Sequence, residues 1–379
     1  MARAIVTPGV IAAVIGGMSV VASCGSTALP IDARPVPGTR ASVVDPAPSA
    51  GRLPDAPRTE ASATTAARAE APTSVEPAAS AEPGERAPPP HGASRFPPHA
   101  FDPPFARTAS EGDGRWTGLA DGARGGVPVM ARALVHPHPI KGFVFVDVIA
   151  IDLAKTELRL VAGTVEPESK GASADVRTGL VPSEDWSRLL AVFNGGFMAR
   201  HGEYGMMLNG TVFVPPRADA CTVLLARDGK IAIRSAAREL EDAPQHLGWR
   251  QTPPCLVERG EVNPRLAQEN ASRIWGAAVG GARDIRRSAL GLDASGSTLF
   301  YGFGEWVTAR DLALAMRQAG AVAAAELDIN WSYTKFFFFT HEDAEPPRIR
   351  ETIVPKLEYD AKRYTSRPAE RDFFYVRAR

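Results

Sequence analysis

The sequence predicts an α+β domain built mostly from antiparallel β-hairpins, with a few helices packed against the sheets. Short runs rich in β-branched and aromatic residues recur after residue 140. Turn pairs such as Asn209-Gly210 and Asp228-Gly229 separate several of these runs, as expected for tight hairpins. Only one segment, from about residue 309 to 319, has clear helical periodicity. Hairpins favour antiparallel pairing, so we expect largely antiparallel sheets in a single globular domain.

The first residues indicate export. Met1 to Arg3 supply a short positive end, and Ile11 to Ala22 form an apolar run too short to span a bilayer as a mature helix. Small residues directly precede Cys24, which resembles the lipobox of a bacterial lipoprotein. We therefore predict a signal peptide over 1–23, lipidation of Cys24, and an extracytoplasmic, membrane-anchored protein of the cell envelope. An ordinary secretory signal with an incidental cysteine is the alternative.

Residues 24–131 are predicted to form a disordered tether. Their composition is dominated by Ala, Pro, Ser, Thr, Glu and Arg, with few large apolar residues. Such a segment cannot bury enough apolar surface to offset the loss of chain entropy on folding. The globular domain is predicted to cover 132–379.

The elements of that domain follow from local patterns. Strands are expected over 143–153 and 157–163, joined by a short connection, and over 189–197, where the strand ends on two glycines. Hairpins are expected within 204–216, 221–236, 255–262 and 288–303. The helix near 309–319 begins with a capping box of Thr308 and Asp311 and stops at Gly320, and a shorter helix is expected around 183–190.

The segment after the helix combines acidic and aromatic residues. We expect residues 321–333 to form a strand, and in a strand Asp328, Asn330, Ser332 and Thr334 would share one face and apolar side chains the other. A buried carboxylate without a partner is costly, so this face indicates a polar cleft or a satisfied polar network in the core.

Bulk charge and motif spacing exclude several functions. Lys plus Arg equals Asp plus Glu at 43 each, so nothing favours a nucleic acid partner. Neither a phosphate-binding loop nor a His or Cys pattern of metal-ligand spacing occurs, so we predict no cofactor and no metal site, while a divalent metal need stays open. Cys221 and Cys255 either pair as a disulfide in an oxidising compartment or remain two buried thiols.

Three motifs together resemble the phosphodiester glycosidase domain family. They are "AVFNGGF" at 191–197, "RRSALG" at 286–291, and a helix followed by "ELD" at 326–328 with a serine at 332. The resemblance covers most of the chain after Lys141. It departs from the family where Leu-Asp-Gly-Gly-Gly-Ser is typical, because 327–332 reads Leu-Asp-Ile-Asn-Trp-Ser.

The resemblance implies hydrolysis of a sugar whose anomeric carbon carries a phosphodiester. Asp328 would stabilise the oxocarbenium charge or orient the attacking water, and Asn194 would bind sugar or phosphate. Arg287 would hold the phosphate, assisted by Arg286 or Arg283. Further substrate contacts are assigned to Gly195, Gly196, Asn330, Trp331, Ser332 and Glu203.

Each assignment has an alternative. Residues 194–196 can be a turn after a strand, and Arg287 a surface arginine. Trp331 can stack on a sugar ring or fill the pocket. Glu203 can be a second carboxylate, a metal ligand beside Asp328, or part of a solvated loop. The sequence therefore supports a membrane-tethered hydrolase of glycosyl phosphodiesters or related envelope linkages, and alternatively a lipoprotein that binds glycan without turnover.

Overall fold

The computed structural model describes residues 96–379, with gaps at 120–122, 125–126, 170, 236–239, 241–244, 279 and 341–345. The chain divides into two units, Met1–Pro83 and Gly84–Arg379, and every described residue belongs to the second. The predicted signal peptide, Cys24 and residues 24–95 of the predicted tether lie outside the described residues. No helix among the described residues is both long and apolar enough to cross a membrane.

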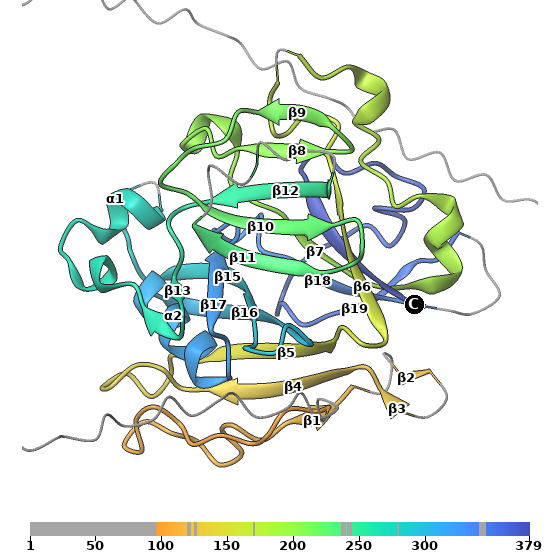
Figure 1. Ribbon diagram of the computed structural model, residues 1–379. Coiled ribbons are helices and arrows are strands. Elements are labelled where there is room, and N and C mark those ends of the chain that lie inside the picture. Colours follow the sequence, from red (N-terminus) through yellow and green to blue (C-terminus); the bar gives the residue numbers. More distant parts are fainter. Residues whose placement is uncertain are drawn as a thin grey trace, which may run out of the picture. The chain divides into compact units, whose positions relative to one another are not determined.

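Strands dominate the described chain (Figure 1). They are β1 Thr117–Gly118, β2 Ala123–Arg124, β3 Val127–Pro128, β4 Met130–Val135, β5 Val146–Asp152, β6 Thr156–Val161, β7 Leu189–Asn194, β8 Met206–Leu208, β9 Thr211–Val214, β10 Cys221–Ala226, β11 Ile231–Ser235, β12 His246–Thr252, β13 Val257–Glu258, β14 Glu261–Val262, β15 Ile285–Leu292, β16 Thr298–Val307, β17 Ala323–Glu326, β18 Phe336–Phe339, β19 Ile349–Thr352 and β20 Phe373–Ala378. The helices are α1 Ala271–Trp275 and α2 Ala309–Gln318, with short 3-10 turns at Ala174–Val176, Ser183–Arg188, Ala199–His201 and Pro264–Ala267.

Three larger sheets carry the fold. One has eight strands in the order β1-β4-β5-β16-β15-β17-β13-β14, and two have five strands, in the orders β11-β10-β12-β8-β9 and β19-β18-β7-β20-β6. The pairs β15–β16, β10–β12 and β20–β7 are antiparallel, like the other pairs of named strands. The predicted α+β class with mostly antiparallel sheets is therefore confirmed.

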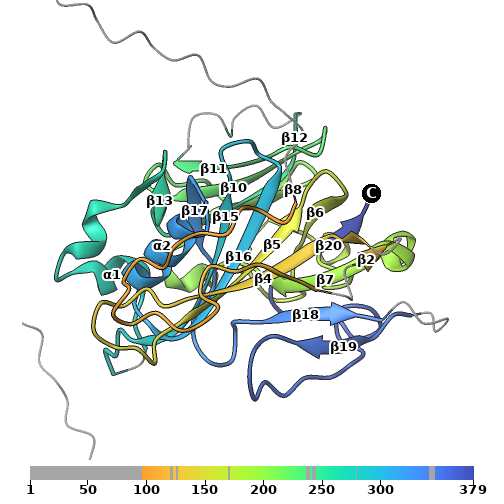
Figure 2. The ribbon, with the colours of Figure 1, turned by 90° about the horizontal axis from the view of Figure 1, so that it is seen from below.

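Apolar side chains fill both faces of these sheets. The largest core collects residues from all three sheets, and a second core lies between the eight-stranded sheet and α2. The four phenylalanines of β18 pack alternately into two different cores. Phe336 and Phe338 join the largest core, whereas Phe337 and Phe339 pack on the opposite face of their sheet. Because side chains of a strand alternate between faces, a run of four phenylalanines fits a strand buried on both sides. Figure 2 shows β18 beside its partner β19.

Most local predictions are confirmed. The turns at Asn209-Gly210 and Asp228-Gly229 join β8 to β9 and β10 to β11 as antiparallel hairpins. The hairpins β13–β14 and β15–β16 also form where expected. Helix α2 begins at the predicted capping box, in which Thr308 and Asp311 bond reciprocally. The short connection between β5 and β6 does not form a hairpin, because β5 pairs with β4 and β16 while β6 pairs with β20.

The prediction that the strand continues through residue 333 is wrong. Strand β17 ends at Glu326, and residues 330–333 form a bend and a turn before β18 begins. Asn330 has a φ of 81°, which an extended strand does not allow. The expected polar face of Asp328, Asn330, Ser332 and Thr334 therefore does not exist.

Residues 96–118, which the sequence assigned to the tether, lie against the eight-stranded sheet. Strand β1 pairs with β4, and the Trp116 ring stacks on Phe300 of β16 at 6.1 Å between centroids. Trp116 and Phe101 also contact each other edge to face. These aromatic contacts bury apolar surface, whereas the residues before them are poor in large apolar side chains. The described fold therefore begins upstream of residue 132.

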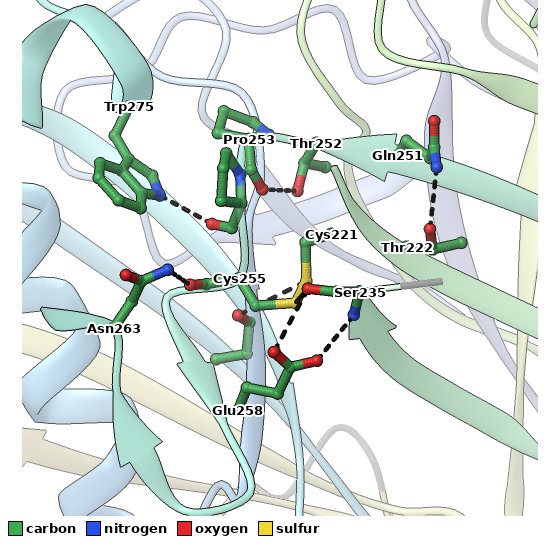
Figure 3. The surroundings of a disulfide bond; sticks show 12 residues. Cys221, Thr222, Ser235, Gln251, Thr252, Pro253, Cys255, Glu258, Asn263 and Trp275 are labelled. Atoms are coloured by element: carbon green, nitrogen blue, oxygen red, sulfur yellow. Dashed lines mark hydrogen bonds between the residues drawn. A yellow bond between two sulfur atoms is a disulfide. The ribbon is translucent and has the colours of Figure 1, made fainter. Parts of the chain in front are cut away.

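Cys221 and Cys255 form a disulfide between the start of β10 and the chain leading to β13 (Figure 3). Both cysteines are buried. Nearby, the Trp275 indole donates to the carbonyl of Pro254 at 2.8 Å, and Asn263 donates to the carbonyl of Cys255 at 2.9 Å. The bridge thus links one five-stranded sheet to the segment that enters the eight-stranded sheet.

Candidate active site

Asp328 lies where segments distant in sequence meet. It follows β17 after one residue, and its backbone N–H donates to the Gly195 carbonyl at 3.0 Å. The Ser288 hydroxyl of β15 donates to the Asp328 carbonyl at 2.9 Å. These bonds fix the backbone at Asp328 against the ends of β7 and β15.

The Asp328 carboxyl pairs with an arginine that the sequence did not single out. One oxygen accepts from the backbone N–H of Ile329 at 2.8 Å, and the other is paired with the Arg371 guanidinium. Only 5% of Asp328 is exposed. Burial raises the pKa of Asp328 to about 7, an effect that Arg371 partly offsets. A carboxyl with a pKa near neutrality suits proton transfer at physiological pH.

Two cavities meet at Asp328. The smaller, about 210 Å³, is lined by the cationic side chains Lys335, Arg363 and Arg371 and by the acidic side chains Asp328, Glu370 and Asp372. The larger, about 520 Å³, is lined by Phe197 and Tyr204 among others. Asp328 and Tyr333 line both. A hexose fits the larger cavity by volume, and the three cationic side chains of the smaller one offer hydrogen-bond donors to an anion.

Arg371 has unused hydrogen-bonding capacity. The Nε and Nη1 atoms of Arg371 are buried and have no acceptor among the described residues. Its guanidinium lies 4.4 Å from the centroid of the Tyr333 ring, which fixes its plane. A buried donor without an acceptor is costly, so an anion with oxygens at this place would be stabilised.

Lys335 adds a second charge to the smaller cavity. Burial, and then repulsion by Arg363 and Arg371, lower the pKa of Lys335 to about 8. The ammonium is therefore charged at neutral pH and becomes neutral a little above it. An anion bound nearby would favour the charged form.

Asn194 lies beside Asp328 but is saturated with protein contacts. Its amide nitrogen donates to Ser288 at 3.0 Å, and its oxygen accepts from the Tyr301 hydroxyl and from the Lys335 backbone N–H, both at 3.0 Å. Asn194 thus joins β7, β15, β16 and the start of β18. The structure places it in the wall of the smaller cavity, where its contacts position neighbouring groups.

The glycines at 195 and 196 are required by close packing. A Cβ at Gly195 would lie 2.1 Å from an Asp372 carboxylate oxygen, and one at Gly196 would lie 2.7 Å from the Arg250 guanidinium carbon. The Gly196 N–H donates to Asp372 at 3.0 Å, and Gly195 donates to the carbonyl of the same residue at 3.0 Å. Their amides therefore bond to the protein, whereas we expected them to face a ligand.

Arg250 and Asp372 form a fully buried ion pair beneath this turn. The Arg250 Nε lies 2.9 Å from an Asp372 oxygen, and both side chains are 0% exposed. Arg250 also donates to the carbonyls of Tyr204 and Gln251, both at 2.9 Å. This pair fixes the turn at 195–196 and, through the chain, the neighbouring Arg371.

Arg287 does not join Asn194 and Asp328. Its guanidinium is buried and pairs with Glu326 at 2.7 Å. It also donates to four backbone carbonyls, those of Trp275, Gly276, Arg283 and Val307. Arg287 lines a different cavity, of about 440 Å³, near α2. Its partners account for its donors, so in this structure it anchors β15.

Arg286, the expected assistant, is also engaged elsewhere. Its guanidinium pairs with Glu305 and lies 4.5 Å from the centroid of the Trp331 ring. Trp331 is 41% exposed, contacts the 52% exposed Trp306, and lines neither cavity at Asp328. Asn330 lines the larger cavity, whereas Ser332 is exposed on the turn.

The loop that replaces three glycines keeps one left-handed position. Asn330 takes it, with a φ of 81°. Asparagine tolerates this conformation better than most residues. Asn330 therefore supplies a left-handed turn here without a glycine.

Glu203 lies apart from Asp328. It is exposed, and it lines a separate groove along β9. No group of three or more His, Cys, Asp or Glu side chains within the described part of the chain is arranged to hold a metal ion. The described side chains at Asp328 therefore offer carboxyl and cationic chemistry.

Sequence reasoning missed Arg371, Lys335 and Arg363. None of the three belongs to a family motif, and Arg371 lies 43 positions from Asp328. The available signal was the adjacent charged residues Arg371 and Asp372 directly before the apolar residues of β20. A charged pair directly before a buried strand marks the entrance of that strand into a polar region.

Comparisons with known proteins are consistent with the three motifs. Residues 187–328 match the phosphodiester glycosidase family. The catalytic domain of zebrafish N-acetylglucosamine-1-phosphodiester alpha-N-acetylglucosaminidase, auto-inhibited by its pro-peptide, aligns with 12% identity and a TM-score of 0.42, covering 70% of this chain and 88% of that one. A hypothetical protein from Synechocystis aligns with 13% identity and a TM-score of 0.36, covering 66% and 62%. No curated protein matches the sequence significantly.

Proposed function

We propose that the chain hydrolyses glycosyl phosphodiesters at Asp328, because residues 187–328 match the phosphodiester glycosidase family. The observation that carries the proposal is the incomplete hydrogen bonding of the Arg371 guanidinium. One of its nitrogens pairs with Asp328, two others lack acceptors among the described residues, and Arg371 lines the smaller cavity. A phosphodiester supplies the missing acceptors next to the carboxyl.

The substrate would span the two cavities. Its phosphate would occupy the smaller cavity, where Lys335, Arg363 and Arg371 neutralise its charge. The sugar would occupy the larger cavity, with the Phe197 and Tyr204 rings in its lining. The anomeric carbon would then lie near Asp328, which lines both.

The chemistry requires one water molecule. The water oxygen attacks the anomeric carbon, and the bond between that carbon and the phosphate oxygen breaks with its electrons on the phosphate. Asp328, as carboxylate, takes a proton from the water and stabilises the positive charge on the sugar. The leaving phosphate is already a stable anion, so a strong general acid is unnecessary. Lys335 and Arg371 favour its departure.

The compartment is part of the proposal. The buried disulfide between Cys221 and Cys255 supports an oxidising, extracytoplasmic environment. We further propose that Cys24 carries a lipid that tethers the domain to a membrane. Radiolabelled palmitate should enter the wild-type protein and not Cys24→Ser, and the variant should leave the membrane fraction. Equal labelling of both would refute the anchor.

The decisive assay is hydrolysis of hexose 1-(methyl phosphate) diesters in ¹⁸O water. Cleavage at the anomeric carbon puts ¹⁸O in the released sugar, whereas cleavage at phosphorus puts it in the phosphate. Asp328→Asn and Arg371→Met should reduce kcat/KM by about 100-fold or more. The exposed pair of Asp360 and Arg367 provides the matched controls Asp360→Asn and Arg367→Met, which should retain activity. No sugar release across several hexoses would refute hydrolysis.

Glycan binding without turnover is the second candidate. The exposed, mutually contacting rings of Trp306 and Trp331 favour it, because exposed indole rings are typical of binding surfaces. Binding of the same diesters, measured by calorimetry with no sugar released, would support this function over catalysis.

A further inference from the structure

A serine, a histidine and an aspartate lie in line far from Asp328 in the fold. They are Ser110 and Asp113, on the segment before β1, and His136, directly after β4. The Ser110 hydroxyl lies 3.4 Å from His136 Nε2, and His136 Nδ1 lies 2.9 Å from both oxygens of Asp113. None of the three lines the cavities at Asp328.

The contacts of Asp113 determine the tautomer of His136. An ionised carboxylate only accepts hydrogen bonds, so a neutral imidazole carries its proton on Nδ1. Nε2 then presents a lone pair toward the Ser110 hydroxyl. Asp113 and His136 are buried, with side-chain exposures of 2% and 5%, so the pair is shielded from competing water.

Asp113 is held rigidly in this role. It also accepts from the backbone N–H of Ser110 at 3.4 Å and of His136 at 3.3 Å, and its own N–H donates to the Ser110 carbonyl at 3.2 Å. The turn from Ser110 to Asp113 thus orients nucleophile and aspartate together. This arrangement is that of a catalytic triad, in which a nucleophile contacts a base and a carboxylate orients the base. Such a triad is recognised by its geometry and not by the positions of its residues in the sequence.

The turn also offers donors for a developing oxyanion. Among the hydrogen bonds of the described residues, none uses the backbone N–H of Glu111 or Gly112. Ser110, Glu111 and Gly112 are exposed, and no atom lies within 4 Å of the place a Cβ would take on Gly112. The amide after a nucleophilic serine is a common member of an oxyanion hole.

Apolar surface lies on an adjoining loop. Thr108, two residues before Ser110, donates its hydroxyl to the His138 carbonyl at 2.8 Å. The same loop exposes Ile140 and Phe143. An open, partly apolar surface of this kind suits an ester with a small acyl group.

We propose that Ser110, His136 and Asp113 form a second, independent site that hydrolyses carboxylic esters. The Ser110 oxygen attacks the carbonyl carbon, and its proton passes to His136 Nε2. The C–O bond to the alcohol breaks, and the leaving oxygen takes that proton. Water then attacks the acyl carbon and gives a proton to His136 Nε2. The bond between the acyl carbon and the Ser110 oxygen breaks, His136 returns the proton to that oxygen, and the carboxylic acid leaves.

The first test is covalent labelling. The full chain is treated with a fluorophosphonate probe, digested and analysed by mass spectrometry. The probe should add to Ser110 and should be absent from that peptide in Ser110→Ala. Ser295→Ala is the matched control, because Ser295 is also an exposed turn serine bonded to an aspartate, Asp293, and its other hydrogen-bond partner among the described residues is a serine, Ser297.

The second test is hydrolysis of p-nitrophenyl acetate. Ser110→Ala should lose the protein-dependent rate by about 100-fold, and Ser295→Ala should retain it. Ser110→Ala should stay folded by circular dichroism, because the turn is held through backbone atoms of Ser110. Asp113→Asn, whose amide can donate to Nδ1 and so place the proton on Nε2, should slow the reaction. An unlabelled Ser110, or unchanged hydrolysis in Ser110→Ala, would overturn the proposal.

Discussion

Removing the charge of Asp372 should destabilise the domain strongly. Asp372 is the counterion of Arg250, both side chains are 0% exposed, and the carboxylate also accepts from the Gly196 N–H at 3.0 Å. In Asp372→Asn, the guanidinium stays buried with carbonyl partners but without an opposite charge. Breaking one side of a buried ion pair costs about 3–5 kcal/mol. That is a large part of the roughly 5–15 kcal/mol that stabilises a typical domain.

Urea unfolding followed by tryptophan fluorescence measures this change. The free energy of unfolding of Asp372→Asn should fall by about 3–5 kcal/mol, whereas the control Asp360→Asn, in an exposed pair with Arg367, should lose about 0–1 kcal/mol. A double variant, Arg250→Met with Asp372→Leu, removes both charges and should recover part of the loss. If Asp372→Asn and Asp360→Asn unfold with free energies that agree within about 1 kcal/mol, the reasoning is refuted.

Three further predictions concern the site, the disulfide and the helix. The kcat/KM for glycosyl phosphodiesters should rise with pH through about 7, as Asp328 loses its proton, and fall above about 8, as Lys335 loses its charge. In Lys335→Arg only the fall on the alkaline side should shift to higher pH. An alkaline fall at the same pH as in the wild type would contradict this. Replacing Cys221 and Cys255 by alanine opens a loop with a sequence separation of 34 and should lower the free energy of unfolding by about 4 kcal/mol, so a urea midpoint equal to the wild type would disprove the role of the bridge. Thr308→Ala removes the cap of α2 and should lower that free energy by about 1 kcal/mol, again measured in urea.

The sequence predicted local structure well where the chain itself supplies the information. Asn209-Gly210 determines a turn through backbone preferences of two adjacent residues, and Thr308 caps α2 through a residue three positions away. The partners of β5 and β6 could not be inferred in this way. Their pairing with β16 and β20 depends on segments more than a hundred residues distant.

The site was predictable only in part, because strand parity decides which way a side chain points. Asn194 and Asp328 do meet in the wall of one cavity. Adjacent arginines 286 and 287 point to opposite faces of β15, one toward Trp331 and the other toward Glu326, and neither lines that cavity. The left-handed backbone conformation of Asn330 is incompatible with the strand that we expected to continue through this residue. The neighbouring residues contain no pattern that predicts this conformation for an asparagine.

The position of β20 has a consequence for biogenesis. This strand pairs with β6 on one side and β7 on the other, so the sheet is divided without it. Among the strands of the described residues it leaves the ribosome after all the others, and Arg371 and Asp372 immediately precede it. A nascent chain that has reached only residue 370 lacks both the partner of Asp328 and the counterion of Arg250. Assembly of this sheet therefore has to wait until synthesis has passed Ala378.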